Sequence, residues 1–253
     1  GSSSQQVSSY PDAPTFLHQA WGQYYFTPQF SVKAGRQEIV YDDERMFGGV
    51  NWSQQGRVHD ALLVMFEDTA SKFSAHAGFA YNQNSASNTA TPYTVASSYK
   101  ELQYLWMNKK FGSLGASLLV MNLGAQSSAS VSSTRYAQTI GTHLSYNKNK
   151  ISSNLKFYYQ TGIDASKKDL QAMMGGFDFH YNITPKFTAG LGIEYLSGQS
   201  QTDTAKSYTD VNHVFTPYFG TNHKFNGYTD YYFAGSAHGN VGLTDLHLKL
   251  RYK

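Results

Sequence analysis

The sequence predicts an all-β fold, an antiparallel transmembrane β-barrel of the bacterial outer membrane. Three observations lead to this prediction: long segments in which apolar and polar side chains alternate, short and long breaks that follow one another between them, and aromatic residues at both segment ends. The segments run for about ten to twelve residues, whereas strands of soluble proteins average about 5 to 6 and tilted membrane-spanning strands need about 9 to 11.

The alternation defines about eleven strands, each with one apolar face. In the tenth, for example, Phe187, Leu191 and Ile193 fall on one face, while Thr188 and Glu194 fall on the other. A period of two residues that persists over each whole segment excludes a helix. In chain order the predicted strands are 16–26, 30–41, 57–67, 73–83, 99–109, 114–123, 135–147, 151–162, 170–182, 187–197 and 241–253.

The breaks between the strands alternate in length. Tight turns are predicted at 27–29, 68–72, 110–113, 147–150 and 183–186, and longer loops at 42–56, 84–98, 124–134, 163–169 and 198–240. Short periplasmic turns opposite long extracellular loops are typical of outer-membrane barrels. In this orientation the first strand starts outside the cell, so we expect an incomplete barrel over 16–253 that follows a disordered or trimmed segment, 1–15.

Aromatic residues near the strand ends predict two girdles, because an amphipathic ring is most stable where hydrocarbon meets headgroup. The girdle near the tight turns comprises Phe26, Phe30, Phe73, Trp106, Phe111, Tyr146, Tyr181, Phe187 and Tyr252, and the girdle near the long loops comprises Tyr41, Tyr81, Tyr99, Tyr136, Tyr159 and Tyr195. A soluble β-sandwich or a secreted β-solenoid would also alternate, but these predict shorter strands, more surface charge and no paired girdles.

Composition agrees with a membrane barrel and excludes several other classes. Charged residues make up only 15% of the chain, against about 25% in soluble domains. No cysteine is present for a disulfide or a thiolate metal site, and a net charge of +3 is too mild to indicate nucleic-acid binding. No catalytic motif with suitable spacing appears, so we expect no enzyme activity, no metal and no cofactor.

Charge is concentrated in the segment 35–68, GRQEIVYDDERMFGGVNWSQQGRVHDALLVMFED. Charges beside a lumen can line a pore and set its selectivity. They can equally form a salt-bridge network that holds an extracellular loop in place. The residues alone leave both interpretations open.

This segment resembles the alginate-export family of outer-membrane proteins, in the run G-R-Q, Y-D-D-E-R, F-G, N-W-S-Q-Q-G-R and H-D-A. A second stretch, HKFNGYTDYYFAGSAHGNVGLTDLHLKLRYK, is similar to a later segment of Bacteroidetes-type members. The resemblance implies a barrel of about eighteen strands in a Gram-negative cell envelope, with anionic polysaccharide passing an arginine-rich lumen. It places Arg36, Arg45 and Arg57 at matching positions, as residues that guide the substrate.

We therefore expect a porin-like transport channel that passes hydrophilic solutes, including anionic polysaccharide, through a lumen surrounded by lipid or lipopolysaccharide. The residues expected to line it are Arg36, Arg45, Arg57, Lys33, Glu38, Asp60, Lys156, Lys249 and Arg251. Further acidic residues expected there, Glu101, Asp178, Glu194 and Asp245, nearly balance the basic ones, which argues against strong selectivity for polyanions.

The alternative is a structural barrel with a plugged lumen that docks a protein partner through loop 198–240. The aromatic residues of this loop are Phe215, Tyr218, Phe219, Tyr228, Tyr231, Tyr232 and Phe233. If exposed, they suggest binding, and if folded inward, they form a constriction.

Overall fold

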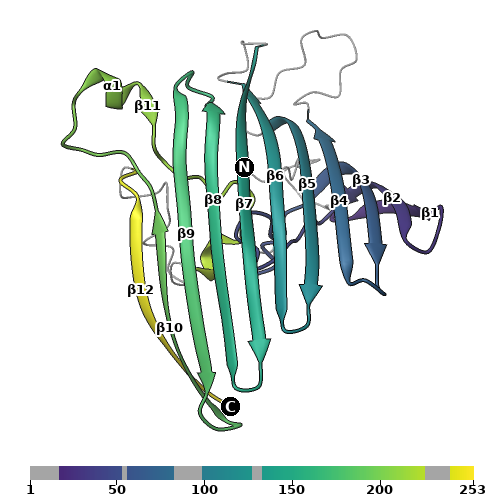
Figure 1. Cartoon of the computed structure of the whole chain (residues 1–253). Coiled ribbons are helices and arrows are strands. Elements are labelled where there is room, and N and C mark those ends of the chain that lie inside the picture. The colour runs from purple at the N-terminus through teal and green to yellow at the C-terminus, as the bar shows by residue number, and fades with distance from the viewer. Residues whose placement is uncertain (1–16, 53–55, 83–98, 127–132, 226–239) are drawn as a thin grey trace, which may run out of the picture.

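The computed structural model describes residues 17–52, 56–82, 99–126, 133–225 and 240–253, and it consists of one curved antiparallel sheet (Figure 1). Eleven strands follow one another across the sheet in chain order, and each pairs antiparallel with its neighbours. The predicted all-β antiparallel class is therefore confirmed. The predicted N-terminal segment 1–15 lies outside the described residues.

The long strands agree closely with those predicted. They are β1 (Ala20–Tyr25), β2 (Phe30–Gln37), β3 (His59–Asp68), β4 (Phe73–Tyr81), β5 (Tyr99–Phe111), β6 (Leu114–Gln126), β7 (Thr134–Lys148), β8 (Ile151–Ile163), β9 (Asp169–Asn182), β10 (Phe187–Leu196) and β12 (Leu243–Tyr252). The short β11 (Val211–Asn212) pairs in parallel with β9. The helical elements of the described chain are α1 (Lys206–Thr209) and the 3₁₀ turn η1 (Asn222–Lys224).

Tight turns connect the strands at one end of the sheet. Lys72, Gly112 and Asn149 take left-handed backbone conformations in the turns that join β3 to β4, β5 to β6 and β7 to β8. Glycine and asparagine tolerate this conformation well, which explains why the chain reverses there. Within the described residues β1 and β12 are the two edges of the sheet, which does not close on itself.

The two faces of the sheet differ in chemistry. Large apolar side chains are exposed on the convex outer face, for example Leu62, Phe79, Val120, Ile140 and Leu248. Side chains that alternate with them point to the concave inner face, where most are buried or polar. An exposed apolar face of this extent indicates a surface that water does not cover. No helix in the described residues is long and apolar enough to cross a membrane.

Most predicted girdle residues lie exposed on the outer face, among them Phe111 and Tyr181 near the tight turns and Tyr81, Tyr136 and Tyr195 near the other end. The prediction was wrong for Tyr41, Trp106 and Tyr99. Tyr41 and Trp106 stack on each other, with ring centroids 4.4 Å apart, and Tyr99 is buried against His59 and Phe219. These three rings pack inside the curve of the sheet, because the chain between β2 and β3 turns inward.

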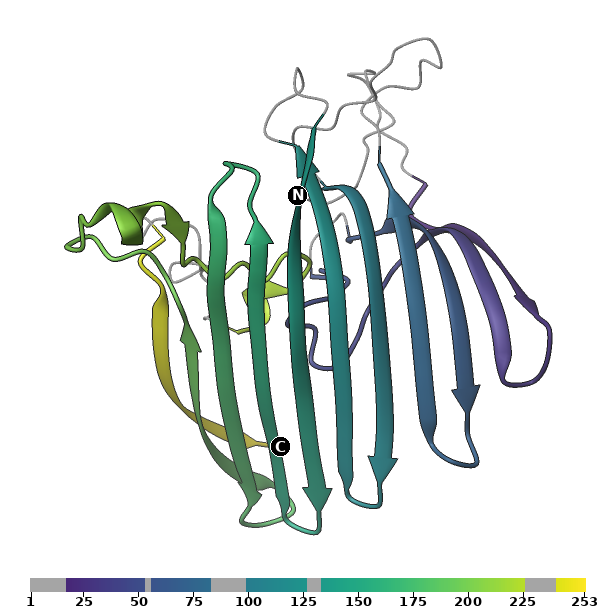
Figure 2. The ribbon, with the colours of Figure 1, turned by 45° about the horizontal axis from the view of Figure 1, so that its top comes forward.

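Two segments lie on the concave side of the sheet (Figure 2). We call residues 38–52 with 56–58 the first inner loop and residues 213–225 the second inner loop. Phe47 and Phe219 form an isolated parallel bridge between them, and their rings stack 5.4 Å apart. The apolar core lies between these loops and the inner face, where it includes Leu102, Met121 and Met174. The described part of the segment 42–56 is therefore not an extracellular loop, as predicted, but lies inside the curve of the sheet.

Candidate functional site

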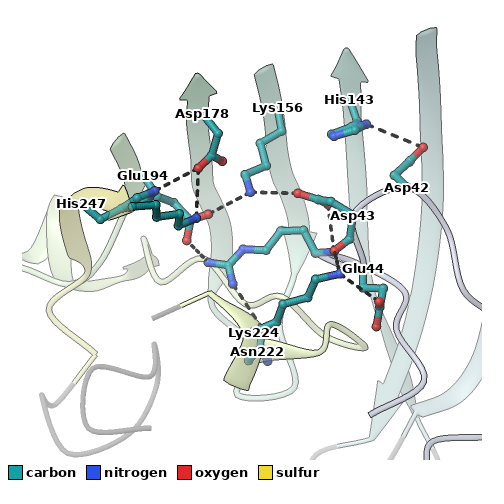
Figure 3. A network of polar contacts seen from close by, with 12 residues as sticks. Asp42, Asp43, Glu44, His143, Lys156, Asp178, Glu194, Asn222, Lys224 and His247 are labelled. Carbon is teal, nitrogen blue, oxygen red and sulfur yellow. Dashed lines mark hydrogen bonds and ion pairs between the residues drawn. The ribbon is translucent and has the colours of Figure 1, made fainter. Parts of the chain in front are cut away.

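Four consecutive charged residues of the first inner loop, Asp42 to Arg45, each contact a different part of the structure (Figure 3). Asp42 reaches two strands: Trp106 on β5 donates a hydrogen bond from Nε1 to Asp42 Oδ2 at 3.1 Å, and His143 Nδ1 on β7 lies 4.0 Å from Asp42 Oδ1. Asp43 and Arg45 reach β8 and β10, and Glu44 reaches the second inner loop.

A buried chain of ion pairs runs through this site. Lys156 Nζ on β8 lies 2.9 Å from Asp43 Oδ2 and 3.3 Å from Glu194 Oε2 on β10, and Arg45 Nη2 donates to Glu194 Oε1. The side chains of Arg45, Lys156 and Glu194 are only 0%, 3% and 6% exposed. The Phe225 ring covers both cations, at 4.5 Å from Arg45 Cζ and from Lys156 Nζ. We call Asp43, Arg45, Lys156 and Glu194 the latch.

The same loop is tied to the second inner loop. Thr221 Oγ1 donates to Glu44 Oε2 at 2.7 Å, and Lys224 Nζ lies 3.0 Å from Glu44 Oε1. Arg57 Nη1 donates to the carbonyl of Phe219 and, at 2.9 Å, to that of Gly220. Since each inner loop binds the other as well as the wall, the two loops form one unit.

Local backbone conformation explains how neighbouring side chains diverge. Asp42 and Glu44 have positive φ angles of 52° and 71°, an uncommon conformation that aspartate tolerates better than most residues. The Glu44 amide donates to the Tyr41 carbonyl at 3.0 Å, and the Arg45 amide donates to Asp43 Oδ1 at 3.1 Å, which closes a tight turn. Left-handed residues in alternation with ordinary ones therefore point successive side chains in different directions.

Burial and charge pairing shift the pKa values in opposite directions along this loop. For Asp43, burial alone would raise the pKa, but attraction to Lys156 and its hydrogen bond outweigh this and hold the pKa below its ordinary value. For Asp42, burial dominates over the hydrogen bond from Trp106 and raises the pKa. Burial also lowers the pKa of Arg45, against the attraction of Glu194, and that of Arg57 to about 10. Of the two neighbouring aspartates, Asp43 is thus the one that favours its charged form.

A second polar cluster lies beside the latch on the inner face. His247 on β12 approaches Asp178 Oδ1 on β9 at 2.9 Å with Nε2, and Asp245 Oδ2 at 3.2 Å with Nδ1. Lys249 Nζ lies 3.3 Å from the same Asp178 oxygen and is more than half exposed. This cluster gives the inner wall accessible charge of both signs. Across the described chain, no three histidine or carboxylate side chains gather in an arrangement that could hold a metal ion.

The structure brings together three of the predicted site residues. Arg45 and Arg57 belong to the first inner loop, and Lys156 on β8 binds this loop to the sheet. Lys249 lies on the inner wall, and Arg251 alternates in step with it. Lys33 lies at the edge of the inner face, 3.9 Å from the Trp21 ring centroid. Lys33, Lys249 and Arg251 therefore lie on the inner side of the sheet, whereas Arg45 and Lys156 are buried in the latch.

Two predicted lumen residues point the other way. Arg36 and Asp60 lie opposite each other on β2 and β3, in step with the exposed Leu62, and they form two hydrogen bonds of 2.8 Å on the outer face. The prediction was wrong because it assigned charged residues to the lumen. Arg36 and Asp60 neutralise each other, so the pair can lie on the outer face. Glu101 also faces outward, where it accepts a hydrogen bond from Tyr136.

Glu38 follows β2 and contacts His18 Nε2 at 2.9 Å, away from the latch. Thr221, Lys224 and Phe225 contact residues 43–45 but were not predicted from the sequence to do so. These contacts join positions about 180 residues apart in the sequence. The only feature of the sequence that pointed to this region was the HKFNG run. Of the loop aromatics, Phe215 and Phe219 are buried inside the curve, which supports the constriction interpretation for them. Tyr228, Tyr231, Tyr232 and Phe233 lie outside the described residues.

Among solved structures, the chain is similar to OmpTdeltaL8, a loop L8 deletion mutant of OmpT, which is an outer membrane protein of Vibrio cholerae. The match has 13% sequence identity, covers 67% of this chain and 71% of that chain, and has a TM-score of 0.39. No family model and no curated protein match the chain. The geometry of the sheet and its inner loops, rather than this likeness, supports the functional proposal below.

Proposed function

We propose that this chain forms the wall and the inner filling of an outer-membrane β-barrel, through which hydrophilic solutes pass. One observation carries the proposal: a single curved sheet has an apolar outer face and a polar inner face, and two loops are held inside it by buried ion pairs. Lipid is the solvent that suits such an outer face, and water suits the inner one.

The exposed tyrosines support the membrane placement. Tyr81, Tyr136 and Tyr195 stand near the long-loop end of the outer face, and Phe111 and Tyr181 stand near the tight turns. Between these two levels the outward positions of β6 are Ala116, Leu118 and Val120, followed by Asn122 next to the level of Tyr136. An apolar band bounded by aromatic rings is the pattern of a transmembrane barrel.

The accessible charges suggest which solutes would pass. Arg45 and Arg57 are occupied in buried contacts, so they do not face a passing solute. Lys249 and Arg251 are exposed on the inner wall, but Asp178 and Asp245 lie among them. We therefore propose weak rather than strong preference for anions, with anionic glycans as the class suggested by the resemblance to the alginate-export family. The proposed role is transport, without catalytic chemistry.

A second candidate is the plugged barrel that serves as a structural or docking protein. The latch favours it, because buried ion pairs resist removal of the inner loops more strongly than surface pairs would. The two functions differ in one measurable property, which is whether the lumen conducts.

Single-channel recording in planar bilayers tests the proposal. The wild-type protein should conduct, and uronate oligomers should reduce the current. Lys156→Met should increase conductance, because it removes the cation that joins Asp43 to Glu194 and so loosens the first inner loop. Lys186→Met, which removes the same charge in an exposed turn far from the latch, is the matched control. Absence of current from both the wild type and Lys156→Met would contradict solute passage and favour the plugged barrel.

A further inference from the structure

The outer face carries a polar surface at the long-loop end of β3 to β7, next to the apolar band of the wall. One row of residues crosses the strands at this end. It begins with the pair Arg36 and Asp60 on β2 and β3 and continues with Tyr81 on β4 and Glu101 on β5. Gly124 on β6 follows, and the row ends at Tyr136 on β7. The next row contains Gln103, Asn122 and Gln138 in direct register. The outward residues immediately beyond this row toward the tight turns are apolar: Leu105, Val120 and Ile140.

The three amides of the second row form a ladder of side-chain hydrogen bonds. Gln138 Nε2 donates to Asn122 Oδ1, and Asn122 Nδ2 donates to Gln103 Oε1, both at 2.7 Å. Each amide group has two donor hydrogens and two acceptor lone pairs, so the ladder uses only part of this capacity. The remaining donors and acceptors lie on a face that borders the apolar band, where unsatisfied polar groups are costly.

A groove of about 460 Å³ lies beside the ladder. Asp60, Tyr81 and Glu101 form its row at the long-loop end, and the next row toward the tight turns places Leu62 and Phe79 in direct register with Gln103. The groove is thus amphipathic along the direction of the strands. It matches a molecule with a polar head at the level of the long loops and an apolar tail toward the membrane centre.

The chemistry of the groove selects the kind of head. The Arg36 charge is paired with Asp60 and its side chain is only 16% exposed, and the Lys100 ammonium is buried 4.3 Å from the Tyr81 ring centroid. No exposed cation in the described part of this surface is therefore available to a phosphate. Carboxylates, amides and exposed tyrosine rings instead suit hydroxyl groups and the apolar faces of a sugar ring.

Glycine 124 helps to build this surface. A Cβ atom there would lie 3.0 Å from Tyr136 Cε1 and 3.3 Å from Glu101 Cβ, so its absence lets the Tyr136 ring cross β6. From there the Tyr136 hydroxyl donates to Glu101 Oε2 at 2.9 Å. The crossing fixes both a ring and a carboxylate at the border of the groove.

We propose that this groove and the amide ladder bind the sugar head of an uncharged glycolipid in the outer leaflet, with an acyl chain against Leu62 and Phe79. The proposal rests on the membrane placement proposed above and adds a specific lipid to it. The amides and Glu101 exchange hydrogen bonds with sugar hydroxyls, and Tyr81 and Tyr136 provide rings against which the sugar packs.

Native mass spectrometry of the detergent-solubilised protein tests the proposal, with monoglucosyl diacylglycerol and phosphatidylglycerol of equal chain length as competing probes. The wild type should retain the glycolipid in preference. Asn122→Leu breaks the ladder in its middle and should weaken glycolipid binding about five- to tenfold, the equivalent of one or two neutral hydrogen bonds. Ser153→Leu, an outward polar-to-apolar change near the tight turns, is the control that should leave binding unchanged.

Three outcomes would overturn the proposal. These are equal retention of both lipids by the wild type, equal effects of Asn122→Leu and Ser153→Leu, or a change in oligomeric state in place of lipid loss, which would identify a contact between copies. Conductance separates this test from the one above: a protein that conducts but ignores the glycolipid refutes only the lipid site. A glycolipid-binding protein that does not conduct refutes only the passage of solutes.

Discussion

Replacement of Glu194 by glutamine is expected to destabilise the inner loops more than any other isosteric change in the latch. Glu194 contacts both Lys156 and the fully buried Arg45. Removal of its charge leaves two buried cations with Asp43 as the nearest carboxylate partner. Since loss of one partner from a buried ion pair typically costs about 3 to 5 kcal/mol, the free energy of unfolding of the loops should fall by about that amount.

Tryptophan fluorescence during urea unfolding in detergent measures this effect. Trp106 stacks on Tyr41 and donates a hydrogen bond to Asp42, so its emission reports release of the first inner loop. Circular dichroism reports the sheet separately. In Glu194→Gln the fluorescence transition should move to lower urea, while the transition seen by circular dichroism should move less.

The double variant Arg45→Met with Glu194→Leu is the control for this experiment. It removes both charges and leaves the pair of Lys156 and Asp43 intact. Apolar replacement of a buried ion pair is often neutral, so the double variant should be more stable than Glu194→Gln alone. If Glu194→Gln shifts the fluorescence transition by less than about 0.5 kcal/mol, the latch does not hold the loop and the reasoning fails.

Three further predictions follow from the same structure. Val50→Gly should stabilise the first inner loop by about 1 kcal/mol in the same urea assay, because Val50 is β-branched and has a φ angle of 55°. Asp43 contributes to the free energy of unfolding because its pKa is lowered in the folded state, and this contribution should be complete above the pKa of the unfolded state and disappear as pH falls below about 4. Asp43→Asn should abolish that part of the pH dependence of stability. Gly141→Ala should lower stability by about 1 to 3 kcal/mol, seen by circular dichroism, because its Cβ would lie 2.0 Å from Tyr158 Cδ1 and 2.5 Å from the Phe157 carbonyl oxygen.

The sheet could be predicted from sequence because its pattern is local. Alternation of side chains identifies a strand from within the strand, and tight turns identify its ends, so β5 to β10 match their predicted ranges within a few residues. The second strand was predicted to end at 41 but ends at Gln37. The alternation continues through Ile39 and Tyr41, and both side chains remain buried or half-buried, but as part of the first inner loop, where Tyr41 packs against Tyr104 and Trp106.

The latch could be predicted only in part. A cluster of mixed charges at 42–45 indicates a salt-bridge network, and the structure contains such a network, but it holds a loop inside the curve and not an extracellular loop. The partners were not predictable, because Lys156, Glu194 and Lys224 are each one polar residue among many on inward faces. The faces of Arg36 and Asp60 were misassigned for a related reason. Near the strand ends the apolar alternation stops, so the face of Asp60 can be assigned only by its spacing of two residues from the outward Leu62.

The distances along the chain within the latch constrain the order in which the protein assembles. Asp43 and Lys156 are separated by 113 residues, and Arg45 and Glu194 by 149. Asp43 and Arg45 are therefore synthesised long before the strands that bind them, and they have no ion-pair partner on the sheet until β8 and β10 are in place. Because closing such long loops is entropically costly, the contacts of residues 43–45 should form late. We therefore expect the charges of Asp43 and Arg45 to stay hydrated during assembly until β10 has paired, and to be buried only then.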